Sequence, residues 1–89
     1  MYFEKAEIIT KDDEDYVVLA IIVENDIEYA FVNKIDKEKD EVTEEYYVFM
    51  YNNNTIYTVT DEKTITRMMP KFQEGIMKNI EELGLMENN

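Results

Sequence analysis

The first 60 residues contain apolar segments typical of strands, separated by polar turns, and the residues after them follow a helical period. The clearest strand signal is Tyr16–Glu24, which contains eight apolar residues and is rich in β-branched types. Asn25 and Asp26 follow, and both tolerate the positive φ that a two-residue hairpin turn requires. The pattern therefore predicts Ile27–Lys34 as the return strand. Weaker signals predict three more strands, at Phe3–Thr10, Thr43–Tyr51 and Thr55–Thr60.

Most links between these predicted strands are short, so an antiparallel meander is the economical topology. A chain of 89 residues is too short for two independent cores, because it buries only about 60–65% of its unfolded surface. Residues 1–89 are therefore predicted to form a single domain. The predicted fold class is α+β, an antiparallel four- to five-stranded meander sheet followed by a C-terminal helix packed on one face.

The C-terminal helix is predicted over about residues 61–84. Thr60 or Asp61 can cap its first turn. Pro70 lies inside the helical pattern, where it either kinks one helix or begins a second. The apolar stripe keeps its phase across Pro70, which favours a kink. Gly84 is predicted to end the helix, and residues 86–89 are predicted to fray. The stripe consists of Ile65, Met68, Met69, Phe72, Ile76, Ile80 and Leu83.

The central hairpin presents an apolar surface on both sides of the sheet. A turn at Asn25 and Asp26 places Glu24 opposite Ile27 and gives two sets of alternating residues. One set is Val18, Ala20, Ile22, Ile27, Tyr29 and Phe31. The other set, a candidate interaction surface, is Val17, Leu19, Ile21, Val23, Ala30 and Val32. One helix covers only one face, so a second layer is predicted. The N-terminal segment, a helix bent at Pro70 or a second subunit could supply it.

The chain is strongly acidic, with 21 acidic residues against 9 basic ones and a formal net charge of −12. Residues 1–60 hold 15 of the acidic residues and 5 lysines. Such a field repels phosphate backbones and anionic lipid, and attracts basic partners and cations. We therefore expect no direct binding to nucleic acid or to a membrane. Tyrosines on the last two strands are expected to pack across strands, since no basic groove accompanies them.

Several residue types that carry chemistry are absent. Without histidine, cysteine or serine, the chain has no Ser–His–Asp or Cys–His site and no histidine–cysteine zinc site. Gly75 and Gly84 are the only glycines, so a glycine-rich phosphate loop is excluded. The sequence predicts a non-enzymatic protein with no cofactor. The lack of cysteine, of a secretory signal and of a long apolar run favours a cytoplasmic location.

Two acidic runs are candidates for contacts with cations or basic partners. The first is Asp12–Asp15. The second contains Asp36, Glu38 and Asp40, spaced like the first ligands of a calcium loop. The loop's glycine position is Glu41 and its last ligand position is Tyr47, so the EF-hand interpretation fails. Solvated turns that protect strand edges are the simpler interpretation. A candidate acidic contact surface comprises Asp36, Glu38, Asp40 and Glu41.

The order of these segments resembles the DUF1292 family, small acidic proteins of low-GC Gram-positive bacteria. The similar segments are YVVLAIIVE, EYAFVNKID, DKEKDE, EEYYVFMY and TIYTVTDEKTITRM, and the resemblance covers roughly residues 7–72. The resemblance contains no catalytic motif and implies no active site. The part of the chain after Pro70 is longer than the family pattern.

The sequence thus favours a protein that acts through contacts with a protein partner or with a second copy of itself. An acidic mimic of nucleic acid, which blocks a DNA- or RNA-binding protein, is one alternative. A weak binder of divalent cations is another.

Overall fold

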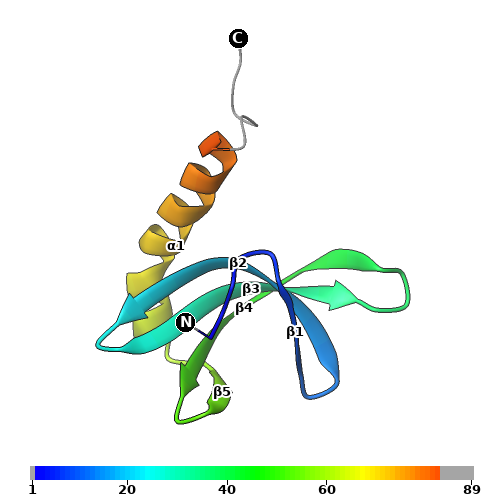
Figure 1. Cartoon of the computed structure of the whole chain (residues 1–89), viewed down its shortest axis with the longest axis horizontal. Helices are drawn as coiled ribbons and strands as arrows, with labels where there is room; N and C mark the ends of the chain where they lie inside the picture. Colours follow the sequence, from blue (N-terminus) through cyan, green and yellow to red (C-terminus); the bar gives the residue numbers. More distant parts are fainter. Residues whose placement is uncertain (1, 83–89) are drawn as a thin grey trace.

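The computed structural model describes the backbone of residues 2–82 and the side chains of residues 2–77. A five-stranded antiparallel sheet in the order β1-β2-β3-β4-β5 is followed by one helix, α1 (Figure 1). The predicted α+β meander is therefore confirmed. The elements are β1 (Ile8–Lys11), β2 (Glu14–Glu24), β3 (Ile27–Asp36), β4 (Glu41–Asn52), β5 (Thr55–Thr58) and α1 (Glu62–Glu82).

Three of the four strand connections are two-residue turns with positive φ at both central residues. This geometry matches the right-handed twist of the flanking strands, and Asn and Asp tolerate it well. The turns are formed by Asp12 and Asp13, Asn25 and Asp26, and Asn53 and Asn54. The predicted central turn is confirmed. The first strand is shorter than predicted, because Phe3–Glu7 do not belong to β1.

A bulge in β2 changes which face its first residues occupy. The predicted pairs Glu24–Ile27 and Ala20–Phe31 are present, but the register shifts between Val18 and Ala20. An extra residue, Leu19, reverses the alternation of side chains before it. The prediction that Val18 shares a face with Ala20 is therefore wrong.

The sheet separates two layers of buried residues. On one side, which we call the helix face, α1 covers the sheet. The core there is Ala20, Val48, Met68 and Phe72. On the other side, the N-terminal face, the chain's own first residues cover the sheet. The core there is Phe3, Ile9, Val18, Ala30, Val32 and Phe49. The predicted second layer therefore exists, and the N-terminal segment contributes to it.

The N-terminal segment crosses β3 and β2 before it turns into β1 (Figure 1). The carboxylate of Glu28 accepts hydrogen bonds from the backbone N–H groups of Tyr2 and Phe3, at 2.6 and 3.0 Å. The ring of Tyr2 stacks on Tyr51 with centroids 4.0 Å apart, and Phe3 is fully buried. Two hydrogen bonds to Glu28, a stacked pair of rings and a buried phenylalanine thus help to hold this segment on the sheet.

The helix α1 is capped and then fixed to the sheet by charged side chains. Asp61 accepts hydrogen bonds from the Thr64 hydroxyl and backbone N–H, and these lower the pKa of Asp61. The carboxylate of Glu24 accepts hydrogen bonds from Arg67, at 2.7 and 2.8 Å, and from Lys71, at 2.9 Å. These two cations, with Arg67 the stronger cause, lower the pKa of Glu24.

Pro70 lies inside the single helix α1, so the interpretation in which it begins a second helix is wrong. The predicted stripe contacts the sheet through Ile65, Met68, Met69, Phe72 and Ile76. Gly84, Leu83 and the tail at 86–89 lie outside the described residues, and the side chain of Ile80 is not described either.

Candidate interaction surfaces

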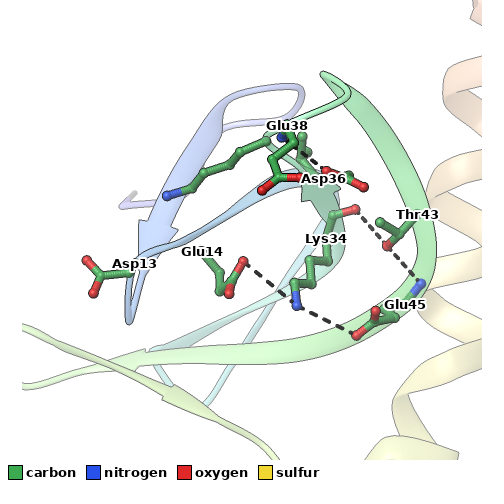
Figure 2. A pocket seen from close by; sticks show the side chains of 9 residues that line it. Asp13, Glu14, Lys34, Asp36, Glu38, Thr43 and Glu45 are labelled. Atoms are coloured by element: carbon green, nitrogen blue, oxygen red, sulfur yellow. Dashed lines mark hydrogen bonds and ion pairs between the residues drawn. The ribbon is translucent and has the colours of Figure 1, made fainter.

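Both acidic runs lie at one end of the sheet, which we call the acidic end. It contains the β1–β2 turn and the β3–β4 turn, because Asp15 pairs with Ile35 across β2 and β3. Between the turns lies a cleft of about 360 Å³ (Figure 2). Five of its nine lining residues are acidic and two are lysines, so the cleft is negative. The lining residues are Asp13, Glu14, Lys34, Ile35, Asp36, Lys37, Glu38, Thr43 and Glu45.

A bulge in β4 shapes one wall of this cleft, and Asn33 holds the bulge. The register of β3 and β4 shifts between Asn33 and Ile35. The Asn33 side-chain amide donates hydrogen bonds to the carbonyl oxygens of Thr43, at 2.8 Å, and Glu45, at 3.1 Å. Asn33 is only 4% exposed. Sequence reasoning missed its role, because Asn33 stands beside Lys34 at the polar end of the strand and the bulge leaves no local signal.

Lys34 lies between two carboxylates in the cleft (Figure 2). Its Nζ is 3.8 Å from Oε1 of Glu14 and 3.9 Å from Oε1 of Glu45. The hydroxyl of Tyr47 donates a hydrogen bond to Glu45 at 3.0 Å, which raises the pKa of Tyr47. Lys34 therefore forms two long ion pairs, and it neutralises only part of the negative charge of the cleft.

The four residues of the predicted acidic contact surface do not all line the cleft. Asp36 and Glu38 line the cleft, whereas Asp40 and Glu41 are exposed and do not. Oδ1 of Asp36 accepts the backbone N–H groups of Glu38 and Lys39, at 3.0 and 3.2 Å, so this carboxylate also shapes the turn. Within residues 2–77, no three acidic side chains converge in a way that could hold a metal ion.

The predicted apolar interaction surface is not a single surface. Ala30 and Val32 are fully buried in the core of the N-terminal face. Ile21 and Val23 line a separate hollow of about 530 Å³, together with Phe3 and residues 4–5. The last two members are displaced by the bulge. Val17 pairs with Asn33 and points to the helix face, and Leu19 is the bulged residue. Contact of Ile21 and Val23 with a partner stays a prediction.

Comparison with protein-family models, with curated proteins and with solved structures finds no match. The resemblance to the DUF1292 family therefore stays a prediction. The helix formed by residues 62–82 is neither apolar enough nor uncharged enough to cross a membrane.

Proposed function

We propose that this chain is a non-enzymatic protein-interaction domain whose acidic end binds a basic segment of a partner protein. One observation carries the proposal: two acidic runs, about 20 residues apart in the sequence, form the walls of one cleft (Figure 2). Residues 7–17 and 33–46, which build the acidic end, hold 11 acidic residues against 4 lysines. More than half of the net charge of −12 is therefore concentrated there.

The arrangement supports a basic partner for an electrostatic reason. Exposed carboxylates held close together repel one another, and a cationic segment relieves this repulsion while it gains contacts of its own. The same carboxylates would repel a ligand that carries phosphate groups. A basic segment of a nucleic-acid-binding protein would fit this cleft as well as any other, so the mimic of nucleic acid is a special case of the proposal.

The test measures the affinity of a lysine- and arginine-rich peptide by fluorescence anisotropy. The variant Asp13→Asn/Glu38→Gln removes two charges from the cleft and leaves the Asp36 turn intact. Its control, Glu62→Gln/Glu74→Gln, removes two charges from α1, away from the cleft. We expect up to about a tenfold loss of affinity for the cleft variant, little change for the control, and weaker binding at higher salt.

The outcomes are distinct. Equal losses in both variants would mean that the peptide responds to net charge alone, and the cleft would have no special role. An affinity that is insensitive to salt would contradict the electrostatic argument.

A further inference from the structure

Only part of the helix face is covered by α1. Figure 1 shows α1 against the half of the sheet nearest the β2–β3 turn, while the β1–β2 and β3–β4 hairpins project away from it. The exposed apolar residues on the uncovered half include Val42 at 63%, Ile8 at 61% and Tyr46 at 51%. Two rows of paired residues cross this half. They are Ile8, Val17, Asn33 and Tyr46, followed by Thr10, Asp15, Ile35 and Val42.

We call the apolar members of these rows the open area: Ile8, Val17, Ile35, Val42 and Tyr46. It continues the surface that α1 already covers. Phe31 stacks on Phe72 of α1 with centroids 5.6 Å apart, and on Tyr46 with centroids 5.4 Å apart. A line of three aromatic rings thus runs from the buried core into the open area. Within the helix face, α1 buries the apolar surface of one half, and the apolar surface of the other half is exposed.

The dimensions of the open area fit one helix. Successive rows on a face are two residues apart, which is about 7 Å along a strand. The rows of Asn33 and Ile35 therefore lie about 7 and 13 Å from the row of Phe31, over which α1 packs. Helices pack with axes about 8–10 Å apart, so a second helix beside α1 would lie between these two rows.

A helix also suits the backbone chemistry of the site. At the centre of the open area, β2 and β3 are paired on both sides, so a ligand lying across this face meets side chains rather than free backbone groups. A helix satisfies its own N–H and C=O groups, whereas an extended segment laid on the face would leave them without partners.

We propose that the open area is the docking site for a basic amphipathic helix of a partner protein, which lies beside α1 with its apolar side on the sheet. This inference rests on the proposed function. The open area lies at the acidic end, whose residues 7–17 and 33–46 carry a net charge of −7. A second copy of this chain would bring the same negative charge to the contact, whereas lysines flanking an apolar stripe would pair with the carboxylate of Asp15, which lies in the row of Ile35, and with the exposed Glu44, between Val42 and Tyr46 in β4.

The experiment compares two peptides of about 18 residues, which is about five helical turns. Both contain only leucine and lysine. In one peptide the leucines follow a helical stripe, and in the other the same residues are scrambled. We expect the striped peptide to bind the full-length protein about tenfold more tightly and to gain helical circular dichroism on binding.

Neutral variants locate the contact without changing charge. Val42→Ser and Ile8→Ser should each lower the affinity for the striped peptide by up to about tenfold, because each removes an apolar contact. Tyr57→Ser is the control, a β5 residue that is 45% exposed and lies outside the open area, and it should leave the affinity unchanged. Thermal melts of each variant confirm that it is folded.

Each outcome decides something different. Equal binding of the striped and scrambled peptides would refute the proposal of a docked helix. It would leave intact the proposal that the acidic end binds basic segments. Failure of both peptides to bind would overturn the proposed function as well. A protein of twice the chain mass in sedimentation that Val42→Ser dissociates would show that a second copy occupies the open area, and would also refute the inference.

Discussion

One buried amide donates hydrogen bonds to two carbonyl oxygens of the bulge in β4, and Asn33→Asp tests how much those bonds stabilise the protein. The replacement has almost the same size, so packing is conserved. The side chain changes from a donor to an acceptor that faces the carbonyl oxygens of Thr43 and Glu45, at 2.8 and 3.1 Å in the native protein. Loss of two donated hydrogen bonds, each leaving a carbonyl oxygen without its partner, costs about 1–3 kcal/mol apiece. We expect Asn33→Asp to lower the free energy of unfolding by about 3–5 kcal/mol at neutral pH.

The pH dependence of that loss provides a second, independent check. Burial and two facing carbonyl oxygens disfavour the charged form, so the carboxyl introduced at position 33 should have a folded pKa above its unfolded value of about 3.9. A raised folded pKa means that the native state binds more protons, and stability falls as the pH rises above the unfolded pKa. The difference between the variant and the native protein should therefore shrink on going from pH 7 to pH 4.

Urea unfolding followed by circular dichroism measures both quantities, and Asn53→Asp is the control. Asn53 is exposed and lies in the β4–β5 turn with φ 52, a conformation that Asp also tolerates. The control should change stability by less than about 0.5 kcal/mol. Equal effects at the two sites, or a loss at position 33 that does not depend on pH, would refute the role assigned to the Asn33 amide.

Three further predictions concern α1. Phe72→Ala should cost about 3–5 kcal/mol of stability because it leaves a cavity in the helix-face core, whereas Glu74→Ala, which is exposed, should change it by less than about 0.5 kcal/mol; urea melts with equal effects would contradict the packing. Gly75→Ala should stabilise the protein by about 0.5–1 kcal/mol, since alanine favours a helix and the added methyl would lie 3.8 Å from the sheet; a lower melting temperature would show that the approach is tighter. Hydrogen bonds from Arg67, and then from Lys71, lower the pKa of Glu24 in the folded protein, so the ionised carboxylate stabilises the fold above the unfolded pKa. This stabilisation is lost as the pH falls through the folded pKa, so Glu24→Gln should flatten the acid side of the plot of stability against pH. An unchanged slope there would mean that the ion pair does not contribute.

The strands and turns were largely predictable because their signals are local. Asn25 and Asp26 fix the hairpin register through the positive φ that a two-residue turn needs, and the structure has the predicted pairs. The bulge at Leu19 was not predictable. Tyr16–Glu24 is apolar on both faces, so the alternation contains no information about where it is interrupted.

The surfaces were predictable only in part, because they depend on register over longer distances. Two apolar faces correctly implied a second layer, but the residues predicted as an interaction surface included Ala30 and Val32, which the N-terminal segment covers. The acidic runs were visible in the sequence, whereas their shared cleft follows from the pairing of Asp15 with Ile35. The role of Asn33 depends on a bulge that no short-range pattern encodes.

The packing of the N-terminal segment and of α1 on opposite faces of the sheet has a consequence for folding kinetics. Each strand pairs with its neighbour in sequence, so the meander forms through short loop closures that cost little entropy. Phe3 and Phe72 must instead find partners far away, as the contacts of Tyr2 with Glu28 and of Arg67 with Glu24 show. We expect the sheet to form the nucleus, with both faces bare, and the two layers to dock afterwards from opposite sides. The segments that dock last would then govern the unfolding rate rather than the folding rate.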